Sequence, residues 1–192
     1  MGIPTNWQLS LMQPIYKGHD KDKTDPASYR GTYTLAKLFE GLLLARLTTN
    51  TEVDNTLASN QLGTKPCTQT HDAIYSLIST IQYNKHTLQK PTYVAFVDYS
   101  TAYPSVHRDR LSSILLHNGI VGHMWHHLRA RIDHIRLRVL HPNIQEHQTV
   151  DILRGLPEGS RLSPTLFGIF VADLIHELQT KSPTLLLILH LV

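Results

Sequence analysis

The chain has little cysteine and little charge. Its single cysteine, Cys67, excludes an internal disulfide framework and a cysteine-rich zinc site, and one free thiol fits a reducing compartment. Charged residues make up 17% of the 192 residues and apolar residues 41%. This balance argues against an intrinsically disordered chain. The length is enough for one domain with a hydrophobic core.

Long apolar runs are also missing. The longest aliphatic run, residues 185–189, is followed by His190 and is predicted to be a buried strand. A transmembrane helix needs about 20 apolar residues. The first ten residues lack the basic segment and apolar core of a secretory signal. We therefore expect an intracellular chain without a membrane span, in either the nucleus or the cytoplasm.

Positive charge is concentrated in one segment. The whole chain has 18 Lys and Arg against 15 Asp and Glu, a net charge of +3. Residues 108–138 contain six arginines and two aspartates, a local charge of +4. Arg136 and Arg138 alternate with apolar residues, which predicts that both lie on one face of a strand. These two arginines are candidates for binding a nucleic-acid backbone, and an ordinary solvated surface is the alternative.

Periodicity and turn signals predict a mixed, α+β domain with no clean linker. Residues 14–34 are expected to form a loop or hairpin. Helices are expected over residues 35–48, 68–83, 108–117, 122–133 and 165–179. Strands are expected over residues 92–98, 135–140 and, from a weaker signal, 149–153. The apolar side of the first helix is assigned to Leu35, Leu38, Phe39 and Leu42.

Asp98 ends the predicted strand 92–98. A carboxylate at the end of a sheet can reach hard cations and phosphates, and Mg²⁺ prefers oxygen ligands of this kind. A turn or capping residue after a strand is the alternative interpretation. A zinc site is not favoured, because His123 and His127 are four residues apart but have no third ligand at an obvious spacing.

The loop 155–164 contains two glycines and two prolines and leads into a predicted helix. Glycine allows a backbone to approach a ligand closely, and Ser160 or Ser163 could cap the helix or donate to an anion. The loop is not a phosphate-binding Walker loop, because no Lys-Ser/Thr pair follows its glycines. It is not a nucleophile elbow either, because no glycine lies two residues after Ser160.

Taken in order, four blocks of the sequence resemble the reverse transcriptase domain of non-LTR (LINE-type) retrotransposons. Residues 14–18 (PIYKG) with residues 37–40 (KLFE) resemble the first block, and residues 61–74 resemble the second. Residues 95–106 (AFVDYSTAYPSV) resemble polymerase motif A. Residues 155–174 (GLPEGSRLSPTLFGIFVADL) resemble motif B. The order and spacing of the four blocks carry the resemblance.

The resemblance implies a right-hand polymerase fold that performs two-metal nucleotidyl transfer with Mg²⁺, an RNA template and a DNA primer. The fingers would comprise residues 1 to about 90 and about 121–148. The palm would comprise residues 91–120, approximately, and residues 149–192.

The resemblance also implies roles for single residues. Asp98 would be the catalytic residue that binds the metal ions, and Tyr103 would stack under the sugar of the nucleotide. Lys17 and Arg30 would grip the triphosphate. Gly159, Ser160 and Pro164 would shape the motif B loop against the nucleotide and the primer–template.

The sequence departs from the family pattern in several places. Gly31-Thr32 replaces Pro-Ile, Pro104 replaces a frequent Asp, and Glu158 replaces Gln. Motif C, an Ala-Asp-Asp hairpin expected after residues 184–192, does not occur in the sequence. One carboxylate cannot hold two cations about 3.5–4 Å apart. We therefore expect a fingers and palm fragment that ends before this hairpin and is inactive alone. The alternatives are a non-catalytic nucleic-acid-binding remnant and a chain with no function.

Overall fold

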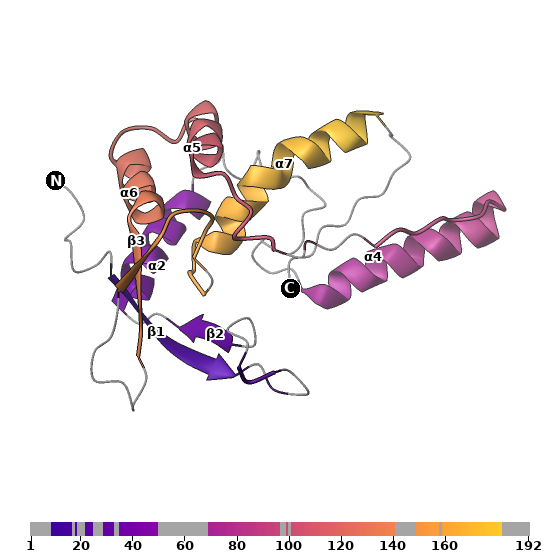
Figure 1. Ribbon diagram of the computed structural model, residues 1–192. Coiled ribbons are helices and arrows are strands. Elements are labelled where there is room, and N and C mark those ends of the chain that lie inside the picture. Colours follow the sequence, from indigo (N-terminus) through magenta and orange to yellow (C-terminus); the bar gives the residue numbers. More distant parts are fainter. Residues whose placement is uncertain are drawn as a thin grey trace.

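The structure is a computed structural model that mixes helices and strands (Figure 1). It describes residues 9–16, 18, 22–24, 29–32, 35–49, 69–96, 99, 101–140, 149–157 and 159–181. The strands are β1 (Leu9–Tyr16), β2 (Tyr29–Thr32), β3 (Ile135–Val139) and β4 (Thr149–Ile152). The helices are α2 (Leu35–Thr48), α4 (Thr70–Tyr83), α5 (Arg108–His117), α6 (Gly122–Asp133) and α7 (Ser163–Lys181). A π-helical turn, η3 (Asn84–Leu88), continues α4.

The four strands form one sheet in the order β2-β1-β3-β4. β1 pairs antiparallel with β2, which places Ile15 opposite Arg30 and confirms the hairpin alternative for the N-terminal region. β1 pairs parallel with β3, and β3 pairs antiparallel with β4. The strand predictions for residues 135–140 and 149–153 are therefore confirmed, to within one residue at their ends.

The helix predictions are confirmed as well. The bounds of α2, α5 and α6 are those expected from the sequence. α4 begins two residues later than expected, and α7 is longer than expected by two residues at each end. Local signals fix these ends. The Gln69 N–H donates to the Asp72 carboxylate at the start of α4 (2.7 Å), and Gly119, with a φ of +73°, follows the end of α5.

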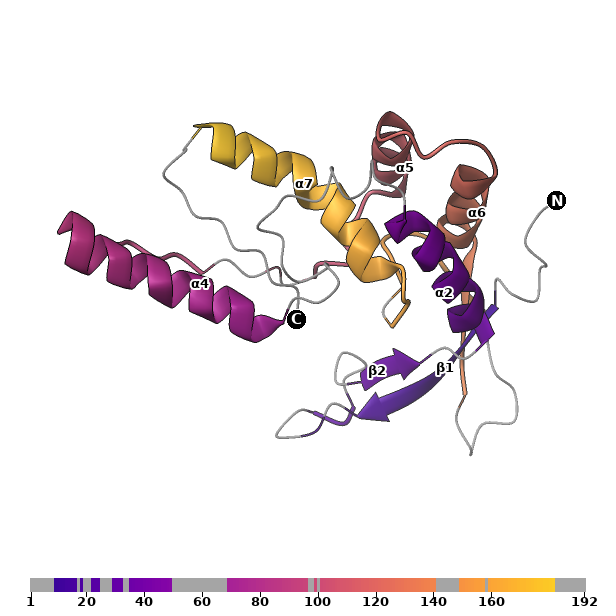
Figure 2. The same cartoon turned by 180° about the vertical axis from the view of Figure 1, so that it is seen from behind.

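The hydrophobic core lies where α2, α5 and α6 meet the N-terminal half of α7. Its largest fully buried side chains include Leu47, Leu111, Leu128, Leu166 and Phe167. Both ribbon views show α2, α5 and α6 near this half of α7, whereas α4 lies apart from them (Figures 1 and 2). The core therefore joins elements that are far apart in the sequence.

The strand predicted over residues 92–98 is wrong for the part that the structure describes. Residues 92–96 have no strand geometry, and the side chains of Tyr93 and Phe96 are 92% and 87% exposed. β-branched and aromatic residues indicate only that a segment would fit a pleated, half-buried surface. Here the sheet is built from β1 to β4, and none of these strands pairs with residues 92–96.

The predicted apolar side of α2 is also wrong. Leu38 and Leu42 are 74% and 62% exposed, while the buried stripe consists of Glu40, Leu43 and Leu47. Leucine or alanine occurs on almost every side of this helix, so periodicity cannot select the buried face. The shared core around Leu43 and Leu47 and the contacts of Glu40 with Arg131 and the Arg161 amide select it instead.

Three sequence predictions lie outside the described residues: the roles of Lys17 and Asp98, and the strand over residues 185–189. Among the helices described, none combines the length and apolar character that a membrane span requires.

We expect Leu111→Ala to lower the free energy of unfolding by about 2–5 kcal/mol, because it leaves a cavity at a side chain that is 0% exposed. Leu116→Ala on the same helix is the control. Leu116 is 44% exposed, so its truncation should cost much less. Urea denaturation of both variants measures the difference. Equal losses would contradict the assigned core.

Candidate functional site

The turn of residues 101–105 lies directly against the start of the loop 155–164. The turn is closed by the Ser105 N–H, which donates to the Thr101 carbonyl (3.1 Å). The Tyr103 carbonyl accepts from the Leu156 N–H across the two segments (2.9 Å). The segments that carry the motif A and motif B patterns are thus joined by a main-chain hydrogen bond.

Gly155 makes this close approach possible. Its φ is +78°, a conformation that L side chains rarely adopt. A Cβ atom at this position would lie 2.5 Å from the Pro104 Cα and 2.7 Å from the Tyr103 carbonyl oxygen. Only glycine fits between the turn and the loop without displacing the backbone.

Two tyrosines flank one phenylalanine at the same junction. The rings of Tyr99 and Tyr103 both meet the Phe167 ring edge to face, with centroid distances of 5.5 and 5.9 Å. Phe167 lies in the second turn of α7 and is 1% exposed. Edge-to-face pairs of this kind add about 0.5–1.5 kcal/mol each beyond the burial of area. Phe167 therefore braces the Tyr103 ring from the core side.

Hydrogen bonds within the loop 155–164 fix its shape. Gly159 has a φ of +78°. The Ser160 hydroxyl accepts from the Leu162 N–H (3.1 Å), and the Ser163 hydroxyl donates to the Pro157 carbonyl (2.7 Å). Both serines are buried, and Pro164 is half-buried in the first turn of α7. The serine hydroxyls therefore hold the loop together.

A buried carboxylate, Glu40, anchors the other end of this loop. Its Oε1 accepts from Arg131 Nε at 2.8 Å, and Arg131 Nη2 also lies 2.8 Å away, without the angle of a hydrogen bond. Its Oε2 accepts from the Arg161 N–H (3.0 Å). The side chains of Glu40 and Arg131 are 1% and 3% exposed. Removing one partner of such a buried pair costs roughly 3–5 kcal/mol.

Sequence reasoning missed this role of Glu40. The available signal was its spacing, because Glu40 shares a helix face with Leu43 and Leu47 at positions i, i+3 and i+7. A charged residue on a buried stripe requires a partner of opposite charge.

Three of the six arginines of the segment 108–138 stabilise the fold. Arg108 donates to the carbonyls of Gly155 (2.8 Å) and Asp133 (3.4 Å), and burial lowers its pKa while Asp133 partly opposes the shift. Arg129 pairs with Asp109 (2.6 Å) and with Asp133. The hydrogen bond and charge of Arg129 lower the pKa of Asp109, and the same contact raises the pKa of Arg129. Arg131 is the third, paired with Glu40.

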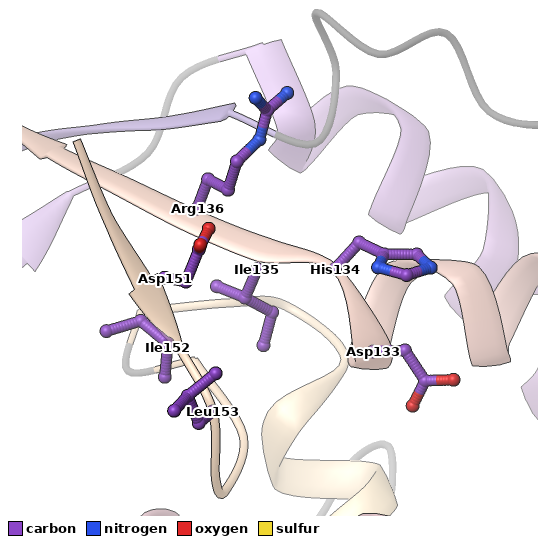
Figure 3. A pocket seen from close by; sticks show the side chains of 7 residues that line it. All are labelled: Asp133, His134, Ile135, Arg136, Asp151, Ile152 and Leu153. Carbon is purple, nitrogen blue, oxygen red and sulfur yellow. The ribbon is translucent and has the colours of Figure 1, made fainter.

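Arg136 and Arg138 lie on β3, as the alternation predicted. Arg136 is opposite Asp151 in the sheet, and Arg138 Nε and Nη2 donate to the Thr149 hydroxyl (3.1 and 3.0 Å). Residues 133–136 and 151–153 line a pocket at this end of the sheet. Figure 3 shows the Arg136 guanidinium pointing away from the apolar side chains that line it.

The described part of the chain does not by itself form a metal site. Among the described residues, no group of three or more His, Cys, Asp and Glu side chains could hold an ion. Asp98, the predicted ligand, lies outside those residues, so they alone do not fit Mg²⁺. The His127 ring packs edge to face on Phe39 (5.9 Å). Of the two residues predicted to grip a triphosphate, Arg30 lies on β2 and Lys17 is not among the described residues.

We expect Gly155→Ala to lower the free energy of unfolding by more than about 1 kcal/mol, through its positive φ and the clash with the turn. Gly122→Ala separates the two causes. Gly122 also has a positive φ, +63°, but a Cβ there would meet nothing within 4 Å. Urea denaturation should show the larger loss for Gly155→Ala, and equal losses would argue against the close approach.

Comparison with known proteins identifies the family of the chain. The family model for reverse transcriptase (RNA-dependent DNA polymerase) matches residues 19–190. The chain is also 27% identical over 184 residues to a probable RNA-directed DNA polymerase from transposon BS of Drosophila melanogaster. The match covers 90% of this chain and 19% of that relative, so the chain spans about a fifth of the relative's length. The chain belongs to the reverse transcriptase family.

Proposed function

We propose that this chain forms the fingers and part of the palm of a retrotransposon RNA-directed DNA polymerase of the non-LTR type. The fingers would comprise residues 1 to about 90 and about 121–148. The palm would comprise residues 91–120, approximately, and residues 149–192. The observation that carries the proposal is the contact between the 101–105 turn and the loop 155–164, through Tyr103 and Leu156. A polymerase of this family needs these two segments side by side, because one would present the metal ligand and the other would support the nucleotide.

In this proposal Tyr103 supports the sugar of the incoming nucleotide. Its carbonyl is held by the Leu156 N–H and its ring is braced by Phe167, so both ends of the residue are fixed. A fixed aromatic ring can serve as a platform without losing side-chain entropy on binding. Asp98, five residues earlier, would bind Mg²⁺.

Two segments would contact the nucleotide. Lys17 and Arg30, from the hairpin region, would hold the triphosphate. Gly159, Ser160 and Pro164 would shape the loop beneath the nucleotide and the primer–template. Since the Ser160 hydroxyl accepts from the Leu162 N–H, we assign Ser160 to the shape of the loop.

Arg136 and Arg138 would contact the backbone of the RNA template or the DNA primer. They lie two residues apart on β3, so their side chains share one face of the sheet. Arg108, Arg129 and Arg131 are assigned to the fold instead, because each makes an ion pair or a carbonyl contact that joins two segments of the chain.

We expect the purified chain to add no nucleotides to a primed RNA or DNA template with Mg²⁺ or Mn²⁺. The sequence has no Asp-Asp pair, and one carboxylate cannot hold two cations. A primer-extension assay measures this, with Asp98→Ala as the reference. Template-dependent extension above that reference would contradict the prediction and would require a second metal ligand.

We expect the chain to bind an RNA–DNA hybrid without sequence preference, with an affinity that falls as salt rises. If both arginines contact phosphate, Arg136→Ala/Arg138→Ala should flatten the slope of log affinity against log salt by roughly 1.4 to 1.8. The control, Lys85→Ala/Lys90→Ala, removes two exposed charges in η3 and just after it, and should leave the slope unchanged. Absence of any hybrid binding would contradict the proposed function itself.

A further inference from the structure

Arg161 lies on the loop 155–164, next to Ser160, and was not among the residues expected to bind nucleic acid. Unlike Ser160, it is exposed. Among the ion pairs of the described residues, none involves its guanidinium. The loop thus presents a cation whose charge is not neutralised by a carboxylate of the described fold.

Two adjacent residues of α2, Glu40 and Gly41, contact Arg161 and hold it in place; we call this pair the seat of Arg161. The Glu40 carboxylate accepts its backbone N–H (3.0 Å). Gly41 leaves room for its side chain, because a Cβ at position 41 would lie 2.9 Å from Arg161 Nη1 and 3.8 Å from Cζ. Backbone and guanidinium of one loop residue are therefore both located by the same turn of helix.

Arg131 allows this seat to be buried. A carboxylate with 1% exposure would be strongly unfavourable without a counter-charge, and Arg131 supplies that charge from α6. Arg131 Nε donates to Glu40 Oε1, so the second carboxylate oxygen, Oε2, accepts the hydrogen bond from the Arg161 N–H.

We propose that Arg161 is a phosphate-binding residue and that Glu40, Gly41 and Arg131 position it. The proposal rests on the proposed function, since it assigns the phosphate to the bound nucleic acid or to the nucleotide. A guanidinium binds phosphate with two parallel N–H donors, and such binding is strongest when the side chain is held in advance. The seat supplies that preorganisation.

The binding test uses the full chain and an RNA–DNA primer–template hybrid. Arg161→Gln should flatten the slope of log affinity against log salt by about 0.7 to 0.9, the effect of one lost phosphate contact. Arg154→Gln is the matched control, because Arg154 is an exposed arginine just before the same loop, and the ion pairs between described residues do not include it. It should leave the slope unchanged. A parallel titration with a deoxynucleoside triphosphate shows whether the phosphate belongs to the nucleotide instead.

Gly41→Ala tests the seat without disturbing the buried pair. Alanine is favoured over glycine within a helix by about 1 kcal/mol, so the melting temperature should stay the same or rise. The added Cβ should displace the guanidinium and weaken binding. In the Arg161→Gln background the same change should have no further effect on affinity. A purely structural role of Gly41 would not produce a stable variant with weakened binding that depends on Arg161.

Hydrogen exchange tests the Glu40 contact independently of nucleic acid. Glu40→Met/Arg131→Met replaces the buried pair by apolar side chains, a change that often leaves stability intact. The Arg161 amide should then exchange about 10- to 100-fold faster, the effect of a lost hydrogen bond to a charged acceptor. Asp109→Asn/Arg129→Met removes another ion pair of α6 and should leave that amide protected.

These results separate the two proposals. Hybrid and triphosphate binding that are both unaffected by Arg161→Gln would overturn this inference alone. Absence of all binding in the unaltered chain would overturn the proposed function with it. An Arg161 amide that exchanges equally fast with and without the Glu40 pair would overturn the role of the seat.

Discussion

The Glu40 carboxylate joins three parts of the chain that are far apart in sequence. One oxygen binds Arg131, 91 residues later, and the other binds the Arg161 amide, 121 residues later. Because the group is buried, it cannot exchange these partners for water without a large free-energy cost. The loop 155–164 therefore has its position fixed relative to α2 and α6 by one side chain.

The opposite end of the loop is fixed by packing and by the main chain. Gly155 allows the turn of residues 101–105 to approach, and the Leu156 N–H donates to the Tyr103 carbonyl of that turn. Phe167 packs against the rings of Tyr103 and of Tyr99, which lies just before the turn. A loop anchored at both ends can present a surface of defined shape between its anchors. That is the physical requirement for a segment that supports a nucleotide, and it explains why the loop carries two glycines with positive φ.

The arginines show that local charge is a poor measure of a binding surface. The segment of residues 108–138 has a charge of +4, yet Arg108, Arg129 and Arg131 have their contacts within the fold. Arg131 neutralises a buried carboxylate that the count of local charge does not include, because Glu40 lies on α2. The arginines proposed to bind nucleic acid lie on β3 and, at Arg161, on the loop 155–164.

The sequence by itself determined the helices and the family. Helix ends such as Asp72 and Gly119 depend on neighbours within a few residues, and motif order can be read along the chain. Only the tertiary structure decided which face of α2 is buried, the parallel pairing of β1 with β3, and the failure of residues 92–96 to form a strand. It also decided that Glu40 contacts Arg131 and Arg161. These features depend on contacts across many residues, and an apolar helix or a β-prone segment is compatible with several such contacts until packing selects one.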